Sequence, residues 1–226
     1  MRTKNVFPYL LLPISFGIFE MASFITMHTH SLNSVIFSTS TPQNILINQL
    51  WFDGYGNVYA ILEFPVIIVV LLLLYLPLKQ KYIRGLAIFP LSIFVSIVAE
   101  WFWLTKNFSY GTIGQSGIVY ALFGVIISIG FVDIIFMYMK KQYDIMIIDI
   151  IVALGMMLIA IFNFEGFFFV SPDVNYFVHE CSFLFGLIAG SAFAIAEGIL
   201  TLKDKQIYES MNAFHSVKHD GIKEVD

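Results

Sequence analysis

A serine between two glycines opens a long apolar segment of this chain. In the stretch YGTIGQSGIVYALFG, residues 110–124, Ser116 follows Gly114 after one residue and is itself followed by Gly117. A serine hydroxyl is a weak nucleophile until a base takes its proton, and histidine is the usual base. The chain has five histidines, and His179 lies near the start of another apolar segment. These residue types suit acyl transfer by a serine and histidine pair, provided that the fold brings them together.

The composition indicates an integral membrane protein. Of the 226 residues 58% are hydrophobic and 12% are charged, and the mean hydropathy is +0.82, whereas soluble domains carry roughly 25% charged residues. The lone cysteine, Cys181, excludes an internal disulfide and any multi-cysteine metal framework. The formal net charge is −4 and basic residues are few, so nucleic acid is excluded as a partner. We expect a multi-pass protein of the cell membrane, with the lipid bilayer as its surroundings.

Six apolar stretches are long enough to cross a bilayer core of ~30 Å, which takes about 20 helical residues. They are Val6–Met27, Val58–Leu78, Leu86–Leu104, Gly117–Met139, Ile145–Phe164 and Phe177–Leu202. Residues 28–57 contain TSTPQN and FDGYGN, which predict a long loop. The expected fold is therefore all-α, a polytopic six-transmembrane-helix bundle over residues 1–202. Residues 203–226 are predicted to form a cytoplasmic tail, either helical or disordered.

The basic residues predict the orientation of these helices. Eleven of the twelve lie on one side of the six spans, and Lys106 alone lies on the other. The positive-inside rule then places both termini in the cytoplasm. Ser116 and His179 both fall at extracytoplasmic helix ends, whereas His215 and His219 fall in the cytoplasmic tail. His28 and His30 fall in the first external loop, so His179 is the histidine at matching depth.

Small residues give the fourth and sixth predicted helices the means to pack closely. At about 100° per residue, one face of the sixth helix combines His179 with Ser182, Gly186 and Gly190. A similar stripe on the fourth helix consists of Gly117, Ala121, Gly124 and Ser128, with Tyr120 on its edge toward Ser116. Such residues let transmembrane helices approach each other closely. If the stripes face each other, Ser116 and His179 meet in a cavity open to external water.

Two segments together resemble rhomboid intramembrane serine proteases. The run GQSGIVYALFG, residues 114–124, is similar to the GxSG segment of that family, including its tyrosine and second glycine. His179, with small residues at 182, 186 and 190, resembles the family's histidine helix. Six helices with both ends cytoplasmic, a serine on the fourth and a histidine on the sixth also match its minimal architecture.

The resemblance implies a role for each matching residue. Ser116 would be the nucleophile, His179 the general base, and Tyr120 the aromatic ring packed against the imidazole, without a third acid. The supporting small positions would be Gly114, Gly117, Gly124, Gly186 and Gly190. The implied activity is hydrolysis of peptide bonds in or near transmembrane segments of other membrane proteins, which requires no cofactor.

The family's oxyanion hole combines the serine backbone N–H with side chains of an HxxxN motif at the start of the second helix. The matching frame here is Asp53 to Asn57. Asn57 fits as a donor because its amide can aim an N–H at developing negative charge. Asp53 stands where the family has histidine, and a carboxylate there repels an oxyanion unless it is protonated. The family's first-loop Trp-Arg element is also absent, because residues 28–57 contain no arginine.

Other interpretations of these residues stay open. Ser116 at a helix start also suits an N-cap, and the departures at Asp53 and in the first loop suit an inactive rhomboid-like protein that binds membrane clients. His179-Glu180 begins like the zinc motif HExxH, but Phe183 stands at its last position, so no metal site is expected.

Acidic residues inside the spans make small-solute transport a third candidate. Toward helix ends, snorkelling or hydrogen bonds to polar neighbours account for Glu100, Asp133, Asp149 and Glu197. Glu63, two residues before Pro65 and deeper in its span, is expected to hydrogen-bond within the bundle.

Overall fold

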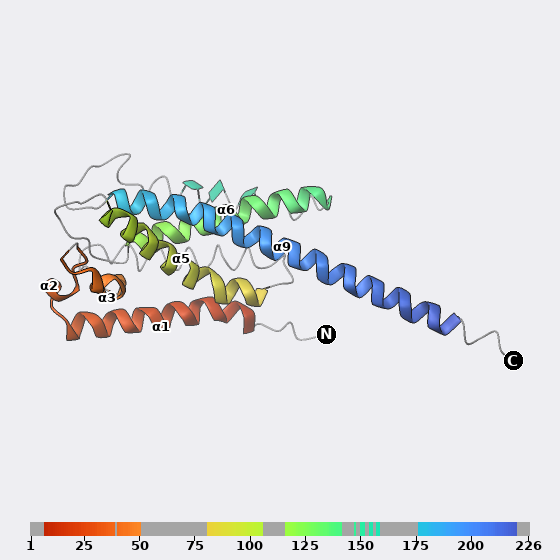
Figure 1. Cartoon of the computed structure of the whole chain (residues 1–226), viewed down its shortest axis with the longest axis horizontal. Helices are drawn as coiled ribbons and strands as arrows, with labels where there is room; N and C mark the ends of the chain where they lie inside the picture. Colours follow the sequence, from red (N-terminus) through yellow and green to blue (C-terminus); the bar gives the residue numbers. More distant parts are fainter. Residues whose placement is uncertain are drawn as a thin grey trace.

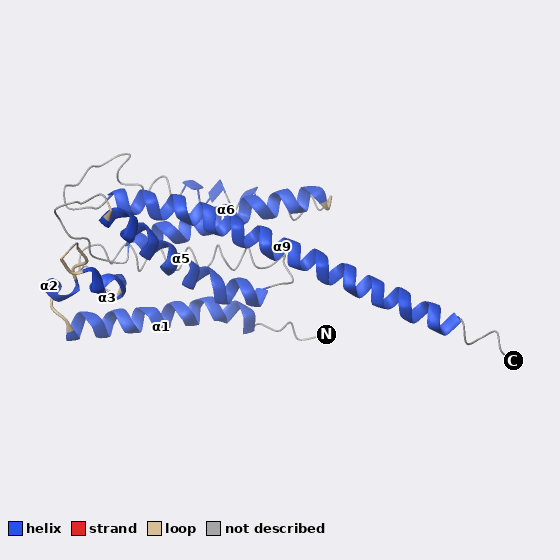
Figure 2. Cartoon of the chain, in the orientation of Figure 1, coloured by secondary structure: helices blue, strands red, loops and turns tan. Residues whose placement is uncertain are grey.

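Four long helices make up most of the part of the chain that the computed structural model describes (Figures 1 and 2). It describes residues 7–38, 40–50, 81–105, 116–141, 147, 150–151, 154–155, 157–158 and 176–220. The long helices are α1 (Phe7–Thr29), α5 (Lys81–Leu104), α6 (Ser116–Met139) and α9 (Tyr176–Asp220). Shorter turns of helix follow α1, namely α2 (Leu32–Val35), η1 (Pro42–Asn44) and α3 (Ile45–Gln49). Over these ranges the chain is helical without strands, as predicted.

Three of the described helices are long and apolar enough to span a membrane. The spanning stretches are Ala87–Leu104, Ser116–Met139 and Tyr176–Leu200, which agree with three of the six predicted spans and identify a membrane protein. The predicted first span coincides with α1 to within two residues. The span predicted at 58–78 lies outside the described residues. Of the span predicted at 145–164, seven residues are described, and all seven are helical.

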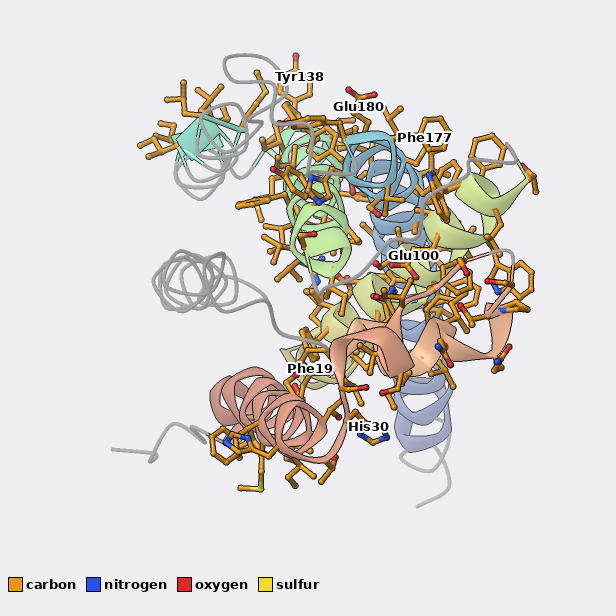
Figure 3. All side chains as sticks on the ribbon, turned by 90° about the vertical axis from the view of Figure 1, so that its left-hand side faces the viewer. Phe19, His30, Glu100, Tyr138, Phe177 and Glu180 are labelled. Atoms are coloured by element: carbon orange, nitrogen blue, oxygen red, sulfur yellow. The ribbon has the colours of Figure 1, made fainter. Side chains whose placement is uncertain are left out.

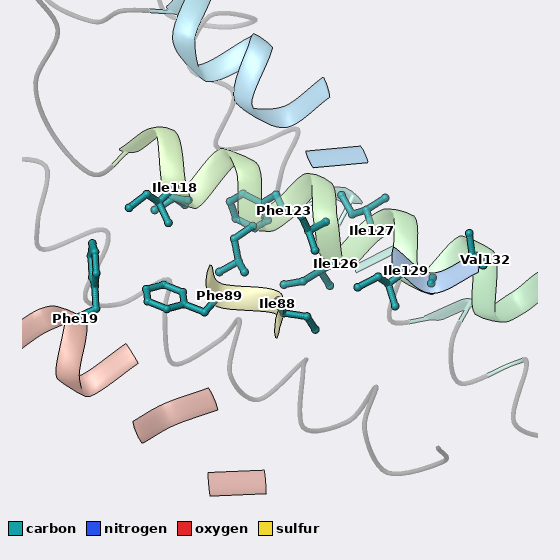
Figure 4. Packing of buried hydrophobic residues seen from close by; sticks show 13 residues of the cluster. Phe19, Ile88, Phe89, Ile118, Phe123, Ile126, Ile127, Ile129 and Val132 are labelled. Carbon is teal, nitrogen blue, oxygen red and sulfur yellow. The ribbon is translucent and has the colours of Figure 1, made fainter. Parts of the chain in front are cut away.

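The central helix of the bundle is α6, which is apolar nearly all round and buries most of its side chains. A helix with that pattern belongs inside a bundle, because no face of it prefers water. Its apolar side chains interlock with those of α5 and α1, where the Phe19 and Phe89 rings meet edge to face with centroids 5.2 Å apart (Figure 4). On its other side α6 packs along α9, which fixes the two helices that carry the predicted site.

The loop after α1 is more helical than the sequence predicted, and the tail, predicted to be helical or disordered, is helical as far as Asp220. The loop after α1 contains the short helices α2, η1 and α3. The predicted last span ends at Leu202, but α9 runs unbroken to Asp220 and projects beyond the other helices (Figure 1). Residues such as Lys203 and Lys205 are good helix formers in water, so a change from apolar to polar residues ends a span without ending its helix.

Candidate active site

Ser116 and His179, 63 residues apart in the chain, lie in hydrogen-bond contact. The Ser116 Oγ is 2.7 Å from the His179 Nε2. Ser116 is the first residue of α6 and is exposed, whereas His179, in the first turns of α9, is buried. When the imidazole proton is on Nδ1, Nε2 accepts the hydrogen bond that the hydroxyl donates. The pair then has the geometry of a nucleophile with its general base.

Two tyrosine rings hold the imidazole in place. The Tyr120 ring stacks on His179 with centroids 4.3 Å apart and planes 21° apart. The Tyr176 ring meets the imidazole edge to face at 6.5 Å and 85°. Because two aromatic rings contact the imidazole, the imidazole loses little further rotational freedom when its Nε2 meets the hydroxyl. The Tyr120 ring thus lies against the imidazole, and its supporting role in the site stays a prediction.

The two stripes of small residues face each other and bring the backbones of α6 and α9 together. A Cβ on Gly124 would lie 2.8 Å from the Leu187 N and would also overlap the Phe183 carbonyl oxygen. A Cβ on Gly186 would overlap the Ala121 carbonyl oxygen, and one on Gly190 would overlap Ser128 and Val125. Only glycine allows this approach, and close contact of this kind is what holds helices together in lipid.

No carboxylate among the described residues is bonded to His179. Glu180, its neighbour in the sequence, is exposed and points away from the bundle (Figure 3). His30 follows the last residue of α1. It lies on a different side of the bundle from Phe177 and Glu180, which are at the start of α9 (Figure 3). Within the described chain, the site therefore consists of Ser116 and His179, and Glu180 points away from it.

Several predicted residues lie outside the described part of the chain. They include both candidate oxyanion residues, Asp53 and Asn57, and the first glycine of the serine motif, Gly114. Glu63 and Asp149 also lie there. Their predicted roles stay predictions.

A buried polar cluster beside the dyad was not predicted. Asn48 Nδ2 donates to Glu100 Oε1 at 2.7 Å, and Ser96 Oγ donates to Gln49 Oε1 at 2.9 Å. These bonds tie the loop helix α3 to α5, with Glu100 between α3 and the long helices (Figure 3). The Ser96 Oγ lies 2.5 Å from where a Cβ on Gly117 would be, so the cluster touches the residue that follows Ser116.

The sequence carries a signal for this cluster, because a glutamate within an apolar span needs a polar partner. For Glu100 the sequence leaves both snorkelling and hydrogen bonding to polar neighbours open, and the structure shows a hydrogen bond from Asn48. The identity of the partner, 52 residues away, was not predicted.

No family model, no curated protein and no solved structure matches the chain. The functional assignment therefore depends on the geometry of Ser116, His179 and Tyr120.

Proposed function

We propose that the protein is an intramembrane serine peptidase of the rhomboid type, acting on transmembrane segments of other membrane proteins. The observation that supports this most is the 2.7 Å contact between the exposed Ser116 hydroxyl and the buried His179 imidazole, which stacks on Tyr120. A serine that served only as a helix cap would need no histidine from another helix. A histidine that served only as a membrane anchor would need no ring stacked on its face.

The dyad can perform acyl transfer without a metal or cofactor. The Ser116 Oγ attacks the carbonyl carbon of the scissile peptide bond while its proton passes to the His179 Nε2. The imidazolium returns that proton to the leaving amine, and a water molecule activated by the same nitrogen then releases the acyl group from serine.

The start of α6 supplies positive charge where the oxyanion forms. The first N–H groups of a helix have no acceptor within the helix, and the helix dipole favours an anion at that end. Ser116 and Gly117 contribute such N–H groups because α6 begins at Ser116. The Asn57 side-chain amide is proposed as a further donor, and one well-placed donor is worth about 10²–10³-fold in turnover.

We further propose six spans with both termini in the cytoplasm. The start of α5, at Lys81, and the end of α6, which Lys140 and Lys141 follow, lie toward the same end of the bundle, opposite the start of α9 (Figure 1). Reporters fused after Asp226 and inserted near Lys141 should both give the cytoplasmic signal. An extracytoplasmic signal from either reporter would contradict this orientation.

The peptidase proposal is tested by a fluorophosphonate probe, which reacts with an activated serine. We expect the wild-type protein to be labelled in detergent or lipid and Ser116→Ala to be silent. Ser128→Ala is the matched control. It removes a buried hydroxyl from the same helix, one that donates to the Val125 carbonyl oxygen of that helix. Wild-type protein that stays unlabelled throughout the pH range in which it is folded would overturn the peptidase proposal.

The second candidate is a rhomboid-like protein that binds membrane clients without cleaving them. Asp53 in the place of the expected histidine favours it. Capture of membrane proteins by an unlabelled but folded wild type would support this candidate over the peptidase.

A further inference from the structure

A buried arginine joins three helices at the far end of the bundle from the dyad. Arg84 of α5 donates from Nη1 and Nη2 to the two carboxylate oxygens of Asp133 on α6, at 2.6 and 2.8 Å. Its Nε and Nη2 lie 2.7 and 2.6 Å from the Glu197 Oε2 on α9. All three side chains are at least nine-tenths buried. One guanidinium thus fixes α6 and α9 to each other through α5.

The position of this cluster along α6 and α9 is matched to the dyad. Asp133 follows Ser116 by 17 residues, and Glu197 follows His179 by 18 residues. At about 1.5 Å per residue, the acids lie about 26 Å along their helices from the dyad. The two helices run in the same direction and contact each other between these points (Figure 1). Polar contacts therefore join the two helices near both ends of their membrane-spanning stretches.

Between these two polar contacts, the packing fixes the distance between α6 and α9 better than it fixes their axial register. Glycines at 124, 186 and 190 let the backbones touch, but such contacts are van der Waals in nature. A planar guanidinium bonded to two carboxylates accepts only a narrow range of positions. Fixing a helix register is the best-attested use of buried polar groups. A helix that slips by one residue moves its side chains by about 1.5 Å, enough to break the contact between Ser116 and His179.

We propose that Arg84 is a positioning residue that sets the axial register of α9 against α6 and thereby keeps the His179 Nε2 at hydrogen-bond distance from the Ser116 Oγ. The effect of Arg84 on catalysis rests on the proposed peptidase function. The effect of Arg84 on the register of the two helices does not, because that register exists whether or not the dyad cleaves a substrate.

The register is measured with a thiol pair that replaces the dyad. In a Cys181→Ala background, which removes the single native thiol, Ser116→Cys and His179→Cys are joined by a short bifunctional thiol reagent. The test variant adds Arg84→Met, Asp133→Leu and Glu197→Met. This triple replacement removes all three charges, because removal of one partner alone would leave buried charge uncompensated. Ser92→Ala, which removes a buried hydroxyl bonded within α5, is the control.

We expect the triple variant to melt near the parent temperature yet lose most of the crosslinked product, while the control crosslinks normally. In the wild-type dyad background the same triple replacement should slow probe labelling. If a folded triple variant crosslinked as well as the parent, the register role would be overturned. The three side chains would then only neutralise one another's buried charge.

Arg84→Lys covers the case in which the triple variant does not fold. It keeps the positive charge but loses the planar fork, so its crosslinking should also fall, and parental crosslinking would again overturn the proposal. A wild type that resists the fluorophosphonate probe overturns the peptidase proposal without affecting the crosslinking result.

Discussion

Replacing Ser116 and His179 together should lower peptide cleavage no further than replacing Ser116 alone. The two side chains share one hydrogen bond, and residues that act as one catalytic unit are strongly non-additive. Without the serine there is no nucleophile for the imidazole to activate. His179→Ala alone should cost about 10²–10⁴-fold, which is the usual contribution of a general base. The measurement is a double-mutant cycle on probe labelling and on cleavage of a transmembrane substrate.

The competing interpretations predict a different cycle. If Ser116 were an N-cap, its loss would cost about 1 kcal/mol of stability, and His179→Ala would add an independent effect. Glu180→Ala is a matched control on α9, because this side chain is exposed one residue from His179 and should leave labelling unchanged. Additive effects of the two dyad replacements on stability, with labelling intact in either single variant, would show that the contact is structural only.

The pairing of α6 with α9 could be predicted because its causes are local to each helix. Gly186 and Gly190 lie on the same face as His179 by helical periodicity alone, and the 3.6-residue repeat does not depend on distant parts of the chain. The charge bias and the serine motif then place Ser116 and His179 at the same end of the membrane. Local periodicity combined with membrane sidedness therefore leaves one question open about how the two helices pack, namely whether their small-residue faces meet.

The polar contacts between other elements could not be predicted in the same way. Arg84 counts in the sequence as one more basic residue near a helix end, yet it pairs with acids 49 and 113 residues away. Asn48 and Gln49 lie in a segment whose composition indicates only a loop. A buried acid indicates that a partner exists, but the identity of the partner depends on how three helices and a loop are arranged in space, which no local pattern records.

Gly186→Leu should separate α6 from α9 and reduce stability and activity together. A Cβ at Gly186 would overlap the Ala121 carbonyl oxygen and lie 3.2 Å from the Gly124 Cα. Overpacking a tight interior costs about 1–3 kcal/mol when side chains can yield. Here the atoms that must move are backbone, so the helices themselves must shift. The expected result is a lower melting temperature with loss of probe labelling.

Gly17→Leu separates this effect from the general cost of replacing a helical glycine in the same protein. Gly17 lies within α1, is exposed, and has no atom within 4 Å of an added Cβ. Leucine favours helix over glycine by several tenths of a kcal/mol or more, so Gly17→Leu should melt at or above the wild-type temperature and keep full labelling. If Gly186→Leu behaved as Gly17→Leu does, the backbone contact between α6 and α9 would not exist, and the dyad that depends on this contact would lose its structural basis.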